Sequence, residues 1–309
     1  MTVDSAGHRL SGTLCAPADT GRFPVVLLVH GSGPLDRDEN MPGQRLNVFS
    51  AIAHDLAGHG VASLRYDKRG CAKSSGSYLT AGISDFVDDA AAWLDALAVH
   101  DASAPGALFV LGHSEGCIVA PQLSLRRPLL EGVILLCPFV EPGESLLLRQ
   151  AAQLQREITQ LRGVAGLATR VISGIGGGTV ASQVRLIQRL NTSTPPTLRV
   201  GWRRVPAKAL RELMSLDAPA LFRQVSAPML VIGGDKDMQC DPADVDRIAE
   251  LAGGPTEVHR LPNLTHILRT EHGSPSILGA RQLLAEPIDP AVITLIINWL
   301  DRRGAYNSA

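Results

Sequence analysis

The sequence predicts an α/β protein with a doubly wound, mostly parallel sheet and a helical segment inserted into it. Apolar runs rich in Val, Ile and Leu recur along the chain without alternation, as in strands buried on both faces of a parallel sheet. Helix-like patterns lie between these runs, and alternating strands and helices are typical of doubly wound folds. One long interval lacks such runs, which indicates an insertion.

Five runs mark the buried strands: Pro24 to Gly31, Val61 to Tyr66, Ala107 to Gly112, Gly132 to Cys137 and Pro228 to Gly234. A further strand is expected in TEVHRL, after the last of these runs. The stretch VDSAGHRLSGTLCAP predicts an antiparallel edge hairpin turned by Ala6 and Gly7. Helical patterns cover Leu46 to Gly58, Asp85 to Val99, Glu115 to Arg126, Asp244 to Ala252 and Pro290 to Arg302.

The interval between Phe139 and Ala227 breaks the alternation. Gly- and Pro-rich joints such as SGIGGG and NTSTPP connect its helix-like segments. We therefore expect a core formed by residues 1–140 and 224–309, with a helical cap of residues 141–223 inserted in it. The expected cap helices are Ser145 to Leu161, Ala181 to Asn191 and Ala207 to Leu216.

The predicted cap is strongly basic. From Arg149 to Arg223 eleven arginines and one lysine outnumber three acidic residues, a net charge of +9, whereas the whole chain carries -1. Arginines on an amphipathic helix commonly form its solvated face. The alternative is that they attract an anionic ligand. Arg203 and Arg204 are the candidate contacts for such a ligand.

Composition restricts the classes of protein and partner. With 45% hydrophobic and 19% charged residues, the 309-residue chain is typical of a globular protein, not of a disordered or collagen-like one. The net charge of -1 gives no reason to expect a nucleic acid partner. Nothing in the sequence indicates the oligomeric state.

The N-terminus and the cysteines favour a cytoplasmic protein. The first residues lack a basic segment followed by an apolar run, and no stretch reaches the roughly 18 apolar residues that span a bilayer. We therefore expect no membrane partner. The five cysteines form no C-x-x-C pair and are odd in number, which fits reduced thiols.

Ser114 is the candidate nucleophile. It is the serine of the G-x-S-x-G pattern in LFVLGHSEGCIVA, directly after a predicted buried strand and before a predicted helix. This is the context of a nucleophile elbow, where flanking side chains would collide with the neighbouring strand and helix. Gly112 and Gly116 fit that requirement. The N-terminus of the following helix favours negative charge at the same place.

A serine hydroxyl needs a base that is held by a third group, and in such folds the acid and then the histidine follow the serine along the chain. The strand PMLVIGG is followed by DKDMQCDP, and His266 follows the next strand. We expect Asp237 to be the acid and His266 the base. Asp235 is the main competing acid. Less favoured alternatives are Asp241, which suits a helix N-cap, Glu141, and His272 as the base, while His259 lies within a strand.

The loop VHGSGPLDRDEN follows the first buried strand and can present backbone N–H groups to an oxyanion. We expect the donors to be the N–H of Ser32 and the N–H of Glu115, the residue after the nucleophile. A phosphate cradle is a weaker interpretation, because no G-K-[ST] follows HGSG, and GIGGG at 174–178 follows no strand. The sequence shows no metal-ligand motif and gives no reason to expect a cofactor.

Five motifs, in this order along the chain, resemble those of the α/β-hydrolase superfamily, and the resemblance extends over essentially the whole chain. They are HGSGPLDRD at 30–38, YDKRGCAKS at 66–74, GHSEG at 112–116, GDKDMQ at 234–239 and NLTH at 263–266. The chain resembles most the bacterial capped serine carboxylesterases with an HGSGPxDRD oxyanion loop and a GHSEG elbow. Ala72 departs from their pattern, where a glycine is usual.

The resemblance implies a serine hydrolase that cleaves a small-molecule carboxylic ester through an acyl-enzyme, without a cofactor. Thioester hydrolysis or acyl transfer on a CoA- or carrier-bound acyl group is the alternative, favoured by the basic cap because these partners are acidic. A third hypothesis is a non-catalytic protein of hydrolase fold that binds a ligand under its cap. Amide or C–C bond cleavage uses the same triad.

Overall fold

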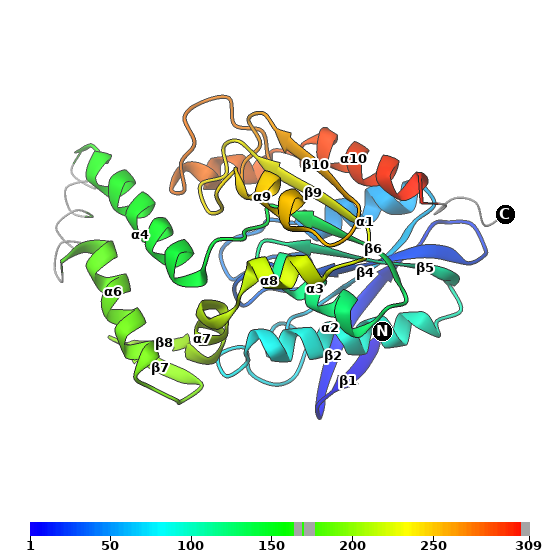
Figure 1. Cartoon of the computed structure of the whole chain (residues 1–309), viewed down its shortest axis with the longest axis horizontal. Helices are drawn as coiled ribbons and strands as arrows, with labels where there is room; N and C mark the ends of the chain where they lie inside the picture. The colour runs from blue at the N-terminus through cyan, green and yellow to red at the C-terminus, as the bar shows by residue number, and fades with distance from the viewer. Residues whose placement is uncertain (164–168, 170–176, 304–309) are drawn as a thin grey trace.

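The computed structural model describes residues 1–163, 169 and 177–303 (Figure 1). Its main feature is an eight-stranded sheet in the order β1-β2-β4-β3-β5-β6-β9-β10. The strands are β1 Thr2–Ser5, β2 His8–Cys15, β3 Phe23–Val29, β4 Ala62–Tyr66, β5 Ser103–His113, β6 Leu130–Leu136, β9 Met229–Gly234 and β10 Thr256–Leu261. Along this order, each strand from β4 onward pairs in parallel with the next one, whereas β2 pairs antiparallel with both β1 and β4. The predicted doubly wound sheet and its edge hairpin are confirmed.

Helices cover both faces of the sheet. Successive strand residues alternate between two hydrophobic clusters, as the pleat requires. Val26 and Leu28 of β3 pack with helix α1 and helix α10, whereas Val25 and Leu27 belong to the cluster on the other face. That second face is covered by α2, α3 and α9. The bounds are α1 Val48–Gly58, α2 Ile83–Ala98, α3 Gly116–Arg126, α9 Asp244–Leu251 and α10 Pro290–Asp301.

The insertion lies between β6 and β9. It contains helices α4 Gly143–Gln160, α6 Gly178–Asn191, α7 Ala207–Ser215 and α8 Ala218–Gln224. In Figure 1, α4 and α6 lie side by side beyond the edge of the core, whereas α8 packs against α3 and α9. Most of the Gly-rich joint at 173–178 lies outside the described residues; Gly177 and Gly178 are described, and α6 begins at Gly178.

One feature of the insertion differs from the sequence prediction of helices alone. Strands β7 Thr197–Val200 and β8 Arg203–Pro206 form a separate antiparallel hairpin. Their residues are exposed or half-buried, so neither strand has the continuous apolar pattern that identified the strands of the main sheet.

No single helix among the described residues is long and apolar enough to cross a bilayer. The 3-10 helix Gly279–Ala285 and α10 satisfy the criteria only as a pair, with a bend of 67° between them.

Candidate active site

The backbone at Ser114 makes a sharp turn between β5 and α3. Its φ is +53°, a left-handed conformation that is uncommon for a residue with a side chain. A Cβ at Gly112 would lie 2.2 Å from the carbonyl oxygen of Gly116, and one at Gly116 would lie 2.2 Å from that of Val29. Only glycine fits at both places, which explains the two glycines of the pattern and gives the geometry of a nucleophile elbow.

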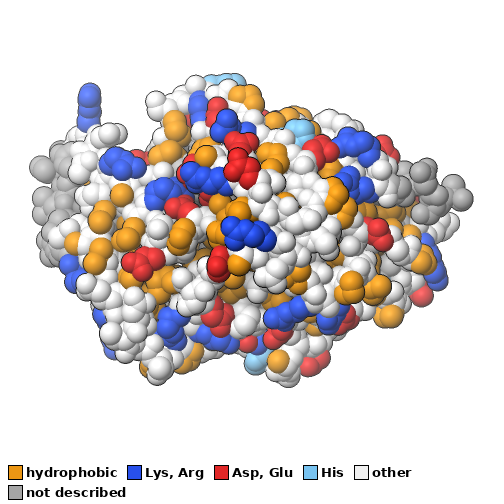
Figure 2. All heavy atoms as spheres, in the orientation of Figure 1, with side chains coloured by type: hydrophobic (Ala, Val, Ile, Leu, Met, Phe, Trp, Pro, Cys, Tyr) orange, Lys and Arg blue, Asp and Glu red, His pale blue; other side chains and the backbone are white. Residues whose placement is uncertain are grey.

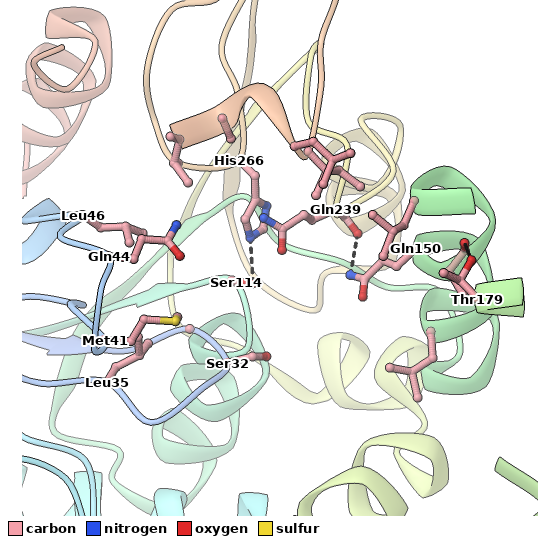
Figure 3. Close-up of a pocket in the computed structure, with 18 of the residues that line it drawn as sticks. Ser32, Leu35, Met41, Gln44, Leu46, Ser114, Gln150, Thr179, Gln239 and His266 are labelled. Carbon is pink, nitrogen blue, oxygen red and sulfur yellow. Dashed lines mark hydrogen bonds between the residues drawn. The ribbon is translucent and has the colours of Figure 1, made fainter. Parts of the chain in front are cut away.

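The structure brings together the three residues predicted to form the triad. His266 Nε2 lies 2.9 Å from Ser114 Oγ, and His266 Nδ1 lies 2.8 Å from Asp237 Oδ2. Asp237 follows β9 and His266 follows β10, so parallel strands bring these loops to the carboxyl edge of the sheet. Figure 3 shows His266 next to Ser114. The proton on each ring nitrogen is assigned by chemistry: Nδ1 donates to the carboxylate, and Nε2 can accept from the hydroxyl.

Asp237 is held in its ionised form. Burial acts to raise the pKa of its carboxyl, but the charge and hydrogen bond of His266 act to lower it, as do bonds from the backbone N–H groups of Cys240 and Gln239. The net effect is a pKa below the ordinary value. A carboxylate therefore faces His266 and stabilises a positive charge on the imidazole.

Most of the alternative acids and bases form contacts with other residues. Asp235 accepts the backbone N–H of Asn263, and Asp241 accepts that of Ala243, just before α9. Glu141 is paired with Arg149, and His259 contacts Glu257. His272 is exposed to solvent. These placements support the choice of Asp237 and His266.

The expected oxyanion donors lie on the two loops that meet beside Ser114. A Cβ placed on Gly31 would lie 3.2 Å from Ser114 Cβ, so the loop after β3 passes close to the candidate nucleophile. Ser32 Oγ donates to Glu115 Oε2 over 3.2 Å. Within the described part of the chain, the backbone N–H groups of Ser32 and Glu115 have no hydrogen-bond acceptor. Both are therefore free to bind an oxyanion.

A buried pair that sequence reasoning missed lies behind the triad. His113 Nδ1 contacts Glu39 Oε2 over 2.8 Å, and His113 Nε2 donates to the carbonyl of His266 over 2.9 Å. The other oxygen of Glu39 accepts the N–H of Gly31. The pair thus connects the loop after β3, the turn that carries Ser114 and the loop that carries His266. The sequence separates its members by 74 residues, so no local pattern could have revealed it.

A carbonyl can only accept, so the bond to His266 requires a proton on His113 Nε2, and the carboxylate on the other side favours a second proton on Nδ1. Burial acts to lower the pKa of His113, but the charge of Glu39 and its hydrogen bond give a net raised pKa. Burial likewise acts to raise the pKa of Glu39, and His113 gives it a net lowered pKa. Both directions describe an imidazolium paired with a carboxylate.

A cavity of about 940 Å³ opens above Ser114 and His266. Its walls are largely apolar and come partly from the insertion, with Leu147 and Leu154 on α4 and Leu186 on α6. Several amide side chains also line it, among them that of Gln183. Those of Gln44, Gln150 and Gln239 are labelled in Figure 3. The size and the largely apolar lining are typical of a pocket for a small molecule.

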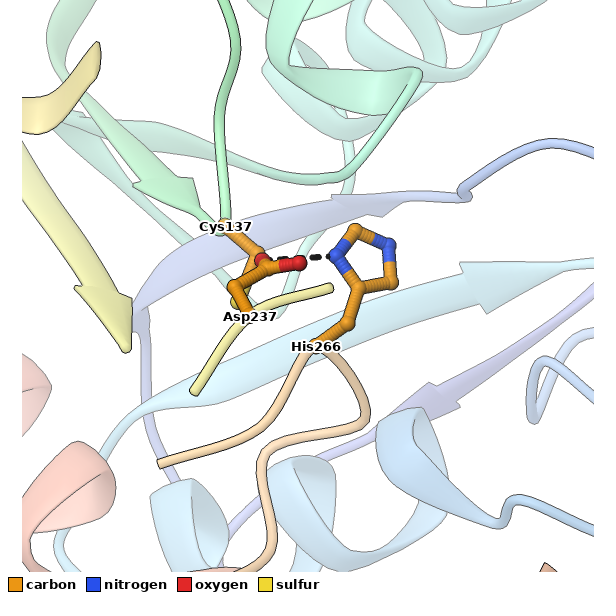
Figure 4. A group of neighbouring side chains, drawn as sticks. All are labelled: Cys137, Asp237 and His266. Atoms are coloured by element: carbon orange, nitrogen blue, oxygen red, sulfur yellow. Dashed lines mark hydrogen bonds and ion pairs between the residues drawn. The ribbon is translucent and has the colours of Figure 1, made fainter. Parts of the chain in front are cut away.

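Cys137, Asp237 and His266 place one potential metal-ligating atom each within 4.8 Å of one another, the one such group found among the described residues (Figure 4). Burial and the charge of Asp237 raise the pKa of the Cys137 thiol well above its ordinary value. The carboxylate and imidazole already bond to each other. Two members of the group, Asp237 and His266, also belong to the predicted triad.

Arg203 and Arg204 lie on the β7–β8 hairpin, and both are exposed. Arg203 stacks on the exposed ring of Trp202, with its guanidinium carbon 4.6 Å from the ring centre. Neither arginine is among the residues that line the cavity, although Val200 of the same hairpin is. In Figure 2, basic and acidic side chains are intermixed over most of the face shown. A substrate contact by these arginines stays a prediction.

Sequence comparison places the chain in a family. The family model described as serine aminopeptidase, S33, matches residues 25–273, which include all three triad positions. The chain belongs to this family of α/β hydrolases. Family membership and the sheet order agree on the α/β-hydrolase fold that the sequence motifs predicted.

Individual relatives are esterases by name. The chain is 26% identical over 302 residues to esterase EstD of Thermotoga maritima, covering 96% of this chain and 66% of that protein, slightly less than two thirds of its length. Among solved structures, Est1E of Butyrivibrio proteoclasticus with bound ferulic acid has a TM-score of 0.64 at 17% identity, covering 99% of both chains. A thermophilic esterase of Thermogutta terrifontis, with malate bound, has a TM-score of 0.58 at 20% identity, covering 98% of both chains.

Proposed function

We propose that this S33-family protein hydrolyses carboxylic esters through an acyl-enzyme on Ser114. The observation that carries the proposal is the chain of two hydrogen bonds from Asp237 through His266 to Ser114 at the floor of a largely apolar cavity. The esterase relatives support the ester as the substrate class.

The geometry supports a two-step mechanism. Ser114 Oγ attacks the ester carbonyl while its proton passes to His266 Nε2, and the carbonyl oxygen becomes an oxyanion bound by the N–H groups of Ser32 and Glu115. The oxyanion collapses, the alkoxide leaves with the proton from His266, and the acyl group stays on Ser114. Water then repeats the sequence, giving its proton to His266 and releasing the carboxylic acid.

The cavity favours an ester over the N-terminus of a peptide. An aminopeptidase has to bind an α-ammonium group, for which a free carboxylate is the natural partner. Among the described residues that line the cavity, Glu39 is the one acid, and it is 1% exposed and already bonded to His113 and Gly31. A neutral ester needs no such partner.

A substrate panel tests this choice. Purified protein is assayed with p-nitrophenyl esters from acetate to octanoate and, in parallel, with the p-nitroanilides of proline, leucine and alanine. We expect ester turnover that Ser114→Ala abolishes, and no comparable turnover of the p-nitroanilides. A higher kcat/KM for an amino-acid p-nitroanilide than for every ester would replace the proposal with an aminopeptidase.

A further inference from the structure

Lys68 is a buried cation that reaches both loops of the proposed oxyanion hole. Its ammonium donates to the carbonyl of Gly31 over 2.7 Å and to Glu115 Oε1 over 2.8 Å. The side chain is only 4% exposed, and Nζ lies 4.4 Å from the centre of the Phe86 ring. Burial of a lysine is unfavourable unless its charge is paired. The position of Lys68 between these two loops therefore suggests a specific role.

The bond to Gly31 determines the direction of the Ser32 N–H. The carbonyl of Gly31 and the N–H of Ser32 belong to one peptide unit, which is planar and trans, so the two groups point in opposite directions. With the carbonyl turned toward Lys68, the N–H is turned away from it. Glu39 accepts the N–H of Gly31 over 2.7 Å, so side chains hold the peptide units on both sides of this glycine.

The bond to Glu115 connects the second donor to the same cation. One carboxylate oxygen of Glu115 accepts from Lys68, and the other accepts from Ser32 Oγ. The backbone N–H of Glu115 is the other expected donor. Lys68 therefore joins the loop after β3 to the elbow after β5 and sets the spacing of two N–H groups that must both lie about 2.7–3.1 Å from one oxyanion.

We propose that Lys68 is a positioning residue that aligns the two donors of the oxyanion hole through the Gly31 carbonyl and the Glu115 carboxylate. Lys68 is not among the residues that line the cavity, so it acts on the donors and not on the substrate. This inference rests on the proposed esterase function of Ser114.

The test compares two buried ion pairs. Lys68→Met with Glu115→Gln removes both charges of the pair at the oxyanion hole. Arg69→Met with Asp89→Asn removes the neighbouring pair, whose side chains are 7% and 1% exposed and contact neither proposed donor. Rates are divided by the concentration of serine that a fluorophosphonate labels at completion, so a partly folded preparation is still measured per active site.

The second measurement is the Ki of an aryl trifluoromethyl ketone. Ser114 adds to its carbonyl carbon, the serine proton passes to His266, and the carbonyl oxygen becomes an oxyanion. For the Lys68 and Glu115 variant we expect kcat to fall by about 10- to 100-fold, which is no more than the loss of kcat when one oxyanion-hole donor is removed. KM should change by less than about threefold. The Ki should rise by the factor by which kcat/KM falls.

The control pair should lower the melting temperature without changing kcat per labelled serine or the Ki. Equal kcat in the wild type and in the Lys68 and Glu115 variant, or equal losses in both variants, would overturn the inference while leaving the esterase proposal intact. If the double variant yields no labelled enzyme, Lys68→Arg is measured instead, because it keeps the cation but shifts its bond to Gly31. We then expect a loss of kcat smaller than that predicted for the double variant, with KM unchanged. A wild-type kcat in Lys68→Arg would overturn the inference.

Discussion

The ring of His113 donates from Nε2 to the backbone carbonyl of His266 over 2.9 Å, while its other nitrogen faces Glu39. The proposed base is therefore held by a second, buried imidazole as well as by Asp237. Because the pair is fully enclosed by the protein, its charges make the stability of the loop that carries His266 dependent on pH.

Replacing His113 by Gln should flatten the pH dependence of the unfolding free energy on the alkaline side. Folding raises the pKa of His113, so its contribution is complete below the ordinary value of 6.5 and is lost as pH rises through the raised value. Denaturant unfolding of the wild type and of His113→Gln from pH 6 to pH 9 measures this difference. Equal slopes for the two proteins would contradict a charged His113.

Asp237→Asn should lower kcat by about 10⁴-fold, because an amide at this place stabilises the wrong tautomer of His266 and cannot stabilise its positive charge. Asp235→Asn is the matched control. Asp235 lies two residues away and accepts a backbone N–H of Asn263, so its replacement should leave kcat within a few-fold of the wild type. A larger loss for Asp235→Asn than for Asp237→Asn would make Asp235 the acid.

Gly116→Ala should destabilise the protein by about 1–3 kcal/mol or more, because its Cβ would lie 2.2 Å from a backbone oxygen of Val29 that cannot easily move. Gly58→Ala, at the end of α1, is the contrasting variant. Its Cβ would meet no atom within 4 Å, and alanine is the better helix former by about 1 kcal/mol. Denaturant melts of both variants check the signs; stabilisation by Gly116→Ala would contradict the close packing of the elbow.

Charge reversal of Arg203 and Arg204 to Glu separates the ester from the acyl-CoA alternative. Since neither side chain lines the cavity, kcat/KM for a short neutral ester should stay within about twofold of the wild type. If the basic hairpin binds acidic CoA or carrier substrates, the KM for acyl-CoA should rise and depend on salt. An unchanged acyl-CoA KM would remove the reason for the thioester alternative.

The main sheet and the proximity of the three triad candidates were predictable because they follow from local patterns and from the order of those patterns along the chain. Continuous apolar runs identify the parallel strands, and parallel strands bring the loops that follow them to one edge, so Ser114, Asp237 and His266 could be placed together from their order alone. The backbone strain at Ser114 was implied by the flanking glycines. The order of the motifs thus carried most of the information on the site.

The missed features depend on contacts between distant segments. Glu39 and His113, and Lys68 and Glu115, lie far apart in the sequence, and nothing local shows that they are buried pairs. The β7–β8 hairpin is short and exposed, so it lacks an apolar pattern. The shape of the cavity depends on how α4 and α6 pack above Ser114, which is a property of the tertiary structure.

Covalent trapping of the nucleophile tests the central claim most directly. The wild type and Ser114→Ala are treated with a fluorophosphonate and examined by intact mass and peptide mapping. A single adduct on the peptide that contains Ser114, lost in Ser114→Ala together with ester turnover, is the predicted result. An adduct on another residue, or labelling and turnover that survive in Ser114→Ala, would contradict the assignment of Ser114 as the nucleophile.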